Sequence, residues 1–375
     1  MKKPISYRLG ELFCGTGGLG RGAFDTLVAI NKEYPSQVAG IRPVWASDYD
    51  KDSCETYCLN NVGNRDTRKV FCVDAKNLEV HSLPEIDGFA FSFPCNDFSQ
   101  TGKRLDVDGR YGGLYRHGIR VIDYQKPKFF VAENVSGIKG THSGRNFKMI
   151  LDELAEAGNG YNITTHLYNA NDYNVPQNRK RIIIVGLDRT LNLRYRVPVP
   201  GNYQRCTGQT SESVYVPPVV KDVLELPFAD DVTNHEKVKH TKKVIERLEC
   251  IKPGESAWTA TLPERLQINC KDVKATQLYR RLEPNKPSYA ITASGGGGNY
   301  IYHYRCKRSL TNRERARLQG FPDSYVFSGN KESVRKQIGA ATPPPLSLAV
   351  FTAVIKTLHG IDYEFIEPSE PEAQR

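Results

Sequence analysis

The alternation of short apolar runs with helix-like segments in the first half of this sequence restricts its fold more than any other feature. Six runs are apolar over most of their length: Arg8–Cys14, Pro43–Asp48, Lys69–Asp74, Gly88–Phe93, Lys128–Glu133 and Arg181–Leu187. Such strands are buried on both faces and alternate with helices in sheets that are mostly parallel. The sequence therefore predicts an α/β fold with a doubly wound, mostly parallel sheet, whose functional groups gather at the carboxyl ends of the strands.

The segments between and after these runs carry helix signals. We expect helices from about residue 19 to 33, after Asp50, around residues 117–124 and from about residue 346 to 358. A further helix is expected to begin at Thr311, because Glu314 completes a capping box there. Gly320 and Pro322 then form its stop signal.

The character of the sequence changes after about residue 191. From there to about residue 305 the apolar runs are short and irregular, and basic residues recur: Lys237, Lys239, Lys242, Lys243, Arg280 and Arg281. This change predicts a second, smaller, loop-rich domain. We expect residues 1–190 to form the larger domain and residues 191–305 the second. Residues 306–375 are expected to return to the first domain and to end in a disordered, acidic tail.

Charge and composition narrow the class of partner and the compartment. The 375 residues carry a net charge of +10, which favours a polyanionic partner, although many soluble proteins are basic without one. No apolar run reaches the roughly 18 residues that span a bilayer, and the start has no signal-peptide core, so we expect a cytoplasmic protein away from membranes. The nine cysteines lack C-x-x-C spacing, which predicts neither a disulfide framework nor a metal site.

Three successive strand ends carry residues that suit a nucleotide-like ligand. The first strand runs into F-C-G-T-G-G-L-G, residues 13–20, whose glycines permit a tight turn and close approach of the backbone to a ligand. Asp48 and Tyr49 end the second strand, where they can bind ribose hydroxyls and stack on a purine, and Asp74 ends the third. The glycines alone are compatible with a purely structural turn, and each acid alone with a helix cap or a surface acid, but together they favour an adenosyl cofactor.

Cys95 stands behind Pro94 at the end of the apolar strand F-A-F-S-F, residues 89–93. A free cysteine is usually a small, buried packing residue. Here a polar segment follows it, with glycines at both ends as in a mobile lid. That segment also carries the basic residues Lys103, Arg104 and Arg110, which can lower the pKa of a thiol. These features favour a nucleophile over a packing residue.

The last two strands supply an acid and a pair of arginines. Glu133 ends its strand, where it can protonate or hold a ring nitrogen, or else cap the turn that follows. Arg179 and Arg181 are two residues apart and therefore share one face of a strand. Two guanidinium groups on one face suit a phosphate, a carboxylate or a carbonyl, although a solvated pair is equally compatible with the spacing.

Taken in order, these segments resemble the cytosine-C5 DNA methyltransferases. The matching motifs are F-C-G-T-G-G for the cofactor loop, F-P-C-N-D-F-S for the nucleophile, E-N-V for the acid, Q-N-R-K-R for the arginines, R-E-R-A-R-L-Q-G-F-P for a late helix and Q-I-G-A-A-T-P-P-P-L-S for the closing motif. The resemblance covers most of the chain outside the basic middle region. It implies a Rossmann-like catalytic domain and a target-recognition domain at residues 191–305.

The resemblance also implies a cofactor and a role for each site residue. S-adenosyl-L-methionine would be bound by Phe13, Cys14, Gly15, Thr16, Gly17, Gly18, Leu19, Asp48, Tyr49, Asp74, Ala75 and Pro94. Cys95 would attack C6 of cytosine, which makes C5 nucleophilic. Glu133 would hold or protonate N3, and Arg181 would clamp the base carbonyl, with Arg179 nearby.

The partners implied are double-stranded DNA, with the cytosine flipped out of the stack, and a companion restriction endonuclease that acts on the same site. A monomer is expected. The chain departs from the family pattern at Asn96, where Gln is usual, and at Ala340, where Asn is usual. An RNA cytosine-C5 methyltransferase, an inactive DNA-binding relative and, least well, a dehydrogenase remain as alternatives.

Overall fold

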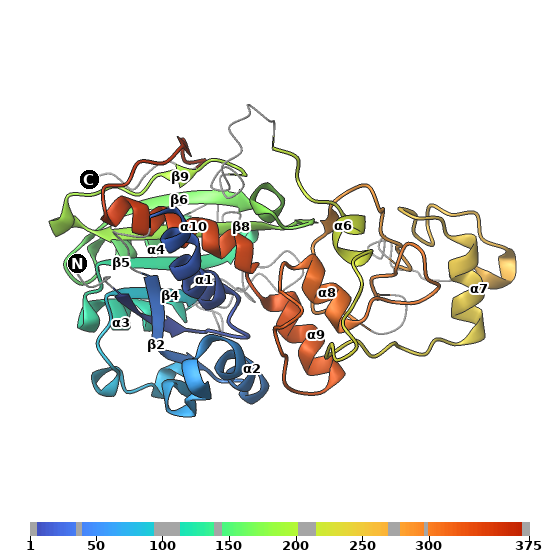
Figure 1. The fold of residues 1–375 in the computed structure, drawn as a ribbon, viewed down its shortest axis with the longest axis horizontal. Coiled ribbons are helices and arrows are strands. Elements are labelled where there is room, and N and C mark those ends of the chain that lie inside the picture. Colours follow the sequence, from blue (N-terminus) through green and yellow to red (C-terminus); the bar gives the residue numbers. More distant parts are fainter. Residues whose placement is uncertain are drawn as a thin grey trace.

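The computed structural model describes residues 6–34, 40–93, 113–138, 145–201, 215–268, 278–295 and 299–369. Figure 1 shows two parts within them: a layered part built on one large sheet, and a part with short helices and long loops. The layered part holds most of the first 200 residues and the last long helix.

A seven-stranded sheet forms the centre of the layered part. Its order is β3-β2-β1-β4-β5-β8-β6. The first five strands are parallel, and β8 runs antiparallel to them. β6 is antiparallel to β8 and therefore parallel to the first five strands. The strands are β1 (Ser6–Leu12), β2 (Gly40–Asp48), β3 (Val70–Cys72), β4 (Gly88–Ser92), β5 (Phe129–Val135), β6 (Tyr161–Asn169) and β8 (Lys180–Asp188). The predicted α/β fold with a mostly parallel sheet is confirmed.

Helices cover both faces of this sheet, as strands with two apolar faces require. In β4, Phe89 and Phe91 point into one core with the helices α3 (Tyr115–Gln125) and α4 (Arg145–Glu156). Ala90 points into the opposite core with α1 (Gly18–Glu33) and α10 (Pro344–Leu358). α2 (Lys51–Asn61) packs near the β2 end of the sheet, where Tyr57 contributes to a smaller cluster.

A helical stretch near the C-terminus is strongly apolar. Residues Lys331–Leu358 are long and apolar enough to cross a membrane, with a mean hydropathy of 1.5 in the most apolar window. However, 78% of that window is buried inside the protein. Because α10 packs along α1 and the sheet, the apolar character of this helix is accounted for by the core.

The second part contains the helices α6 (Val220–Leu224), α7 (Lys242–Cys250), α8 (Asn312–Leu318) and α9 (Lys331–Ala340). α8 and α9 share one apolar cluster with residues between Val220 and Tyr304, and α7 packs on a separate, smaller cluster. A short parallel pair, β7 (Gln177–Asn178) with β10 (Ser288–Tyr289), joins this part to the layered part. A second pair, β9 (Val197–Pro198) with β11 (Phe365–Ile366), is antiparallel.

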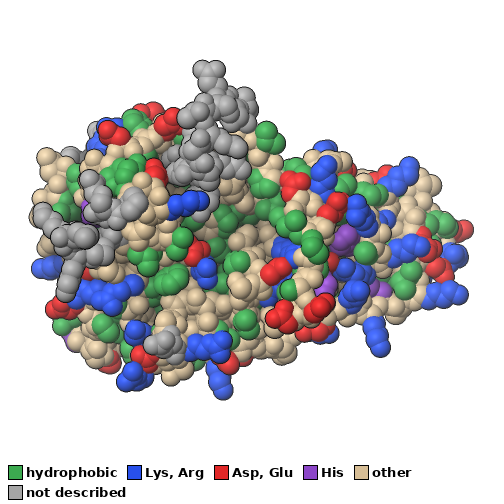
Figure 2. All heavy atoms as spheres, in the orientation of Figure 1, with side chains coloured by type: hydrophobic (Ala, Val, Ile, Leu, Met, Phe, Trp, Pro, Cys, Tyr) green, Lys and Arg blue, Asp and Glu red, His purple; other side chains and the backbone are tan. Residues whose placement is uncertain are grey.

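Basic side chains gather on the second part, around α7 (Figure 2). Lys237, Lys239, Lys242 and Lys243 are exposed there. Arg281 differs from them, because it is buried and its guanidinium donates to the carbonyl oxygens of Leu248 and Ile251. Arg281 therefore stabilises this part from within, while the four lysines face outward.

Candidate active site

A cavity of about 480 Å³ opens at the carboxyl ends of β1, β2, β4 and β5. Its lining brings together most of the predicted site residues from the described part of the chain: Phe13, Cys14, Gly15, Thr16, Gly18, Leu19, Asp48, Tyr49, Glu133 and Arg181. Ser92 and Phe93 also line it, and Phe93 directly precedes Pro94 and Cys95 in the sequence. Pro94, Cys95, Asn96 and the segment expected to act as a lid lie outside the described residues.

The Gly-rich loop between β1 and α1 turns tightly at the floor of this cavity. Phe13, Gly15 and Gly17 all have positive φ angles, of 54°, 49° and 88°. The conformation is natural for the glycines but costly for Phe13, so the surrounding structure must hold it. A Cβ atom on Gly15 would meet no atom within 4 Å. The loop thus exposes bare backbone, which a ligand can approach closely.

Asp48 holds the Gly-rich loop at Gly15. Its Oδ2 accepts a hydrogen bond from the Gly15 N–H at 2.9 Å, and its Oδ1 accepts one from the Asp50 N–H at 2.9 Å. Burial raises the pKa of the Asp48 carboxyl above its usual value, while these N–H groups act in the opposite direction. Tyr49 follows it with 76% of its surface exposed, so the face of its ring is accessible at the mouth of the cavity.

Asp74 and Ala75 lie in an adjoining cavity of about 180 Å³, which shares Phe13, Asp48 and Tyr49 with the first. Asp74 caps the short 3-10 helix η3 (Ala75–Asn77) by accepting from the Lys76 N–H. The Arg120 guanidinium, from α3, donates to the carbonyl oxygens of Ala75 and Leu78 and so holds this turn in place. All three predicted strand ends therefore face one connected space.

Glu133 and Arg181 form an ion pair in the lining of the same large cavity. Arg181 Nε lies 2.8 Å from Glu133 Oε1, and the two side chains are only 14% and 8% exposed. They come from the neighbouring antiparallel strands β5 and β8, in which Glu133 is opposite Ile183 and Val135 is opposite Arg181. This diagonal arrangement puts both side chains on one face of the sheet. The pair presents a carboxylate and a guanidinium together to anything inside the cavity.

Arg179 does not lie beside Arg181 in the cavity lining. Its Nη1 donates to the Ile291 carbonyl and its Nη2 to the Gly339 carbonyl, both at 2.9 Å. The expectation of a shared face assumed one continuous strand. β8 instead begins at Lys180, so that Arg179 precedes it and is drawn toward carbonyl groups of the second part. Its contacts tie the two parts of the molecule together.

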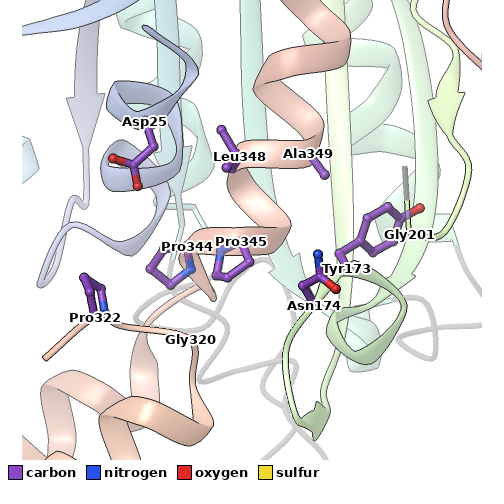
Figure 3. Close-up of a pocket in the computed structure, with 10 residues that line it drawn as sticks. All are labelled: Asp25, Tyr173, Asn174, Gly201, Gly320, Pro322, Pro344, Pro345, Leu348 and Ala349. Atoms are coloured by element: carbon purple, nitrogen blue, oxygen red, sulfur yellow. The ribbon is translucent and has the colours of Figure 1, made fainter. Parts of the chain in front are cut away.

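A separate hollow of about 230 Å³ lies where α1, the start of α10 and the loop after α8 meet (Figure 3). Its lining is mostly apolar and includes Pro322, Pro344, Pro345 and Leu348. Asp25 is the one carboxylate among its lining residues. Because none of the predicted site residues lines it, the chemistry is assigned to the larger cavity.

Comparison with known proteins agrees with this geometry. Residues 7–356 match the family of C-5 cytosine-specific DNA methylases. The chain belongs to this family. It is a DNA cytosine-C5 methyltransferase, and members of this family use S-adenosyl-L-methionine as methyl donor.

Individual relatives support the same assignment. The methylase is 42% identical over 367 residues to the Type II methyltransferase M.BbvI of Brevibacillus brevis, covering 96% of this chain and 94% of that protein. It is 33% identical to the Type II methyltransferase M.NgoFVII of Neisseria gonorrhoeae, over 89% of this chain and 82% of that protein. A prophage-encoded Escherichia coli protein described as a DNA modification methyltransferase has the same fold, with a TM-score of 0.70, 21% identity and coverage of 94% and 99% of the two chains.

The cavity of the methylase suits S-adenosyl-L-methionine. Thr16 lines the cavity, and its buried hydroxyl oxygen has no hydrogen-bond partner among the described residues. A polar ligand would satisfy such a group. The carboxylates of Asp48 and Asp50 complement the positive charge of a sulfonium and an amino group. The open space above Gly15 leaves room for close contact with the backbone.

Sequence reasoning missed several lining residues of the methylase. Asp50 and Ser53 come from the start of α2, and Ser333, Lys336 and Gln337 come from α9. The closing motif contributes Ala340, Ala341 and Thr342. The sequence analysis predicted no helix at α9, and only the packing of this helix reveals that its side chains line the cavity.

Proposed function

We propose that this methylase transfers a methyl group from S-adenosyl-L-methionine to C5 of a flipped cytosine in double-stranded DNA through a covalent bond to Cys95. The observation that carries the proposal is the single cavity that joins the Gly-rich loop to the Glu133–Arg181 pair. Phe93, which lines this cavity, leads in the sequence directly to Pro94 and Cys95. A methyl donor and a base can therefore meet beside one thiol.

The cofactor end of the site is formed by the loop residues Phe13 to Leu19 with Asp48, Tyr49, Asp74, Ala75 and Pro94. When bound, S-adenosyl-L-methionine supplies an electrophilic methyl group on a positively charged sulfur. Asp48 orients the ribose while it holds the loop through Gly15, and the exposed Tyr49 ring covers the adenine. The turn of Asp74 and Ala75, held by Arg120, borders the adenine edge.

The base end of the site activates an unreactive carbon. Cys95 Sγ bonds to C6 of cytosine, and the electron pair of the C5–C6 double bond becomes available at C5. Glu133 holds or protonates N3, so that negative charge does not accumulate on the ring. Arg181 donates to the base carbonyl and keeps the Glu133 carboxylate oriented. After C5 has gained the methyl group, it loses its proton, and the C6–S bond breaks to release Cys95 as a thiolate.

DNA is bound by both parts of the molecule. The basic residues around α7, together with the loops of residues 191–305, are proposed to contact phosphates and read neighbouring bases. We assign residues 1–190 and 306–375 to the catalytic domain and residues 191–305 to target recognition. α8 and α9 share an apolar cluster with residues of the middle region, which supports a fixed position of that region on the catalytic domain.

The biological setting proposed is a restriction-modification system in the cytoplasm, in which the methylase acts as a monomer. The Type II methyltransferase names of the relatives support this setting. Methylation would then protect host DNA from a companion restriction endonuclease acting on the same sequence. An RNA cytosine is the alternative substrate, but neither the family description nor these relatives' names favour it.

The test is transfer of a labelled methyl group from S-adenosyl-L-methionine to duplex DNA and to RNA, followed by bisulfite sequencing. Wild-type protein is expected to label DNA at C5 of one cytosine within a fixed sequence, and Cys95→Ala is expected to label nothing. Labelling of RNA alone would reject the substrate. Undiminished labelling of DNA by Cys95→Ala would reject the covalent mechanism.

A further inference from the structure

A layer of buried polar side chains that do not line the cavity supports the Gly-rich loop. Asn61, near the end of α2, donates to the Gly17 carbonyl at 3.1 Å. Tyr57, one turn earlier, donates to Glu11 Oε2 at 2.8 Å. The third member, Tyr325, is distant in sequence, yet its hydroxyl donates to the Thr16 carbonyl at 2.5 Å. Two consecutive loop carbonyls are thus held by side chains from two different segments.

The fit at Gly17 shows how closely these three side chains approach the loop. A Cβ atom on Gly17 would lie 2.0 Å from Asn61 Nδ2, 2.7 Å from Tyr57 Cδ2 and 3.0 Å from the Tyr325 hydroxyl. No side chain other than hydrogen can occupy that space without moving them. The loop backbone therefore packs directly against these side chains, and its position depends on Tyr57, Asn61 and Tyr325.

Tyr325 belongs to the second part of the molecule. Its ring is fully buried and packs against Phe321 and Phe327, with ring centroids 4.7 and 5.3 Å away. The same apolar cluster includes Leu282 and Ile301 from the middle region. Asn61 Nδ2 also donates to the Tyr325 hydroxyl at 3.2 Å, so this oxygen both accepts and donates in a fixed geometry.

Other hydrogen bonds along α2 strengthen the same junction. Thr56 donates to Gln337 Oε1 at 2.7 Å, and the Ser328 N–H donates to the Thr56 hydroxyl at 2.9 Å. The Asn60 side chain exchanges hydrogen bonds with the backbone of Val326 in both directions. These contacts fix residues 325–328 against α2, so the Tyr325 hydroxyl cannot shift far from the Thr16 carbonyl.

We propose that Tyr325 is a positioning residue for the cofactor, acting through the Thr16 carbonyl to hold the Gly-rich loop in its binding conformation. This inference rests on the proposed cofactor site. Thr16 lines that site, while its carbonyl accepts a hydrogen bond from Tyr325, which is not among the residues that line it. The left-handed backbone at Gly15 and Gly17 has to be maintained before a ligand arrives, since a preformed loop loses less conformational entropy on binding. The C-terminal part of the chain thereby completes the cofactor site.

The test compares Tyr325→Phe with wild-type protein by calorimetric titration of S-adenosyl-L-methionine and by steady-state kinetics on duplex DNA. The variant keeps the ring in its cluster and removes only the hydroxyl. We expect the Kd and the KM for S-adenosyl-L-methionine to rise about tenfold, because the loop loses one buried hydrogen bond. At saturating cofactor, kcat is expected to stay within about twofold of wild type.

The matched control is Tyr161→Phe, in β6. Its hydroxyl also donates to a backbone carbonyl, that of Pro127, at 2.7 Å in a buried setting, but it does not line the cavity. Both variants delete one buried hydroxyl, but Tyr325 also loses the hydrogen bond that it accepts from Asn61, so thermal melting of the two is compared as well. The cofactor affinity of Tyr161→Phe is expected to equal that of wild type.

Each outcome decides one question. An unchanged cofactor Kd in Tyr325→Phe, or a Kd raised equally in Tyr161→Phe, would overturn the positioning role. A fall in kcat at saturating cofactor without a change in Kd would overturn it as well. If wild-type protein itself bound no S-adenosyl-L-methionine, the proposed function would fail instead, which separates the two claims.

Discussion

At the scale of single residues, the Glu133–Arg181 pair has the most direct consequences for the reaction. An ion pair that is almost fully buried is costly to assemble and does little for stability by itself. Its position in the cavity lining gives it a use, because the carboxylate can face a ring nitrogen while the guanidinium faces the adjacent carbonyl. In the proposed reaction, the pair therefore lies where the cavity receives the base.

Glu133→Gln is predicted to lower kcat by roughly 10²- to 10⁴-fold, because an amide cannot share a proton with N3. Gln retains an oxygen for Arg181 Nε, so the Kd for S-adenosyl-L-methionine should change little. The melting temperature should fall, because the nearly buried guanidinium loses its countercharge. Single-turnover methyl transfer measures the effect. The control is Glu153→Gln, whose partner Arg116 is on the surface away from the cavity. Wild-type turnover in Glu133→Gln would contradict the assigned role.

The Glu11 carboxyl is expected to make the stability of the folded protein depend on pH. It is fully buried in β1 beneath the Gly-rich loop, and burial raises its pKa to about 8, although hydrogen bonds from Tyr57 and Gly20 act in the opposite direction. The folded protein thus keeps the proton up to about pH 8, whereas the unfolded chain releases it near the usual value of 4.5. Unfolding between these values releases a proton, so a rise in pH favours the unfolded state.

The free energy of unfolding of the wild-type protein, relative to that of Glu11→Gln, is predicted to fall as pH rises from about 4.5 to about 8. The slope from one group is at most about 1.4 kcal/mol per pH unit. Urea unfolding of both proteins at intervals between pH 5 and 8.5 measures it. The subtraction removes the contributions of other groups, because Gln is neutral at every pH. A constant difference across this range would contradict the buried, protonated carboxyl.

At the scale of elements, the close contact between α1 and α10 fixes the helix that follows the Gly-rich loop. A Cβ atom on Gly22 would lie 2.3 Å from Ser347 Cβ, 2.5 Å from Leu348 N and 2.7 Å from the Pro344 carbonyl oxygen. Two of these are backbone atoms, which cannot rotate away. The two helices can approach this closely only because α1 has glycine at the contact.

Gly22→Ala is therefore predicted to lower the free energy of unfolding by about 1–3 kcal/mol, because the added methyl group overpacks the helix contact. Denaturant unfolding measures the loss. Gly63→Ala is the matched control, since a Cβ atom there would meet no atom within 4 Å. Equal stability of the two variants would contradict the close packing of α1 on α10.

The sequence predicted the elements whose pattern was unambiguous. β1, β2, β4, β5 and β8 are apolar on both faces, and each was expected within a few residues of its bounds. β6 and α4 were missed. β6 contains Thr164, Thr165 and His166, which break the apolar pattern of a buried strand. The antiparallel placement of β8 was also missed, because periodicity carries no information on strand direction.

At the scale of the whole molecule, long-range contacts decide which predicted residues reach the site. The strand-end rule brought Asp48, Asp74 and Glu133 to one connected space, because the ends of parallel strands meet at one edge of the sheet. It could not place Arg179, whose partners Ile291 and Gly339 are more than 100 residues away. Tyr325 gave no signal either, since nothing in its local sequence points to Thr16.

The central claim is that one cavity brings a methyl donor and a cytosine to Cys95, and a mechanism-based trap tests it directly. Duplex DNA that contains the target sequence with 5-fluorocytosine is incubated with the protein and S-adenosyl-L-methionine. In this base, fluorine replaces the hydrogen at C5. Fluorine cannot leave as a cation in the way that the hydrogen leaves as a proton, so elimination is blocked and the C6–S bond should persist after methyl transfer. Digestion and mass spectrometry then locate the adduct.

We predict a peptide that carries the methylated, fluorinated base on Cys95, formed only when S-adenosyl-L-methionine is present. Cys95→Ala should give no adduct under the same conditions. The account would be contradicted by an adduct on another cysteine, such as the exposed Cys72, or by methylation of ordinary DNA without any adduct on the fluorinated duplex.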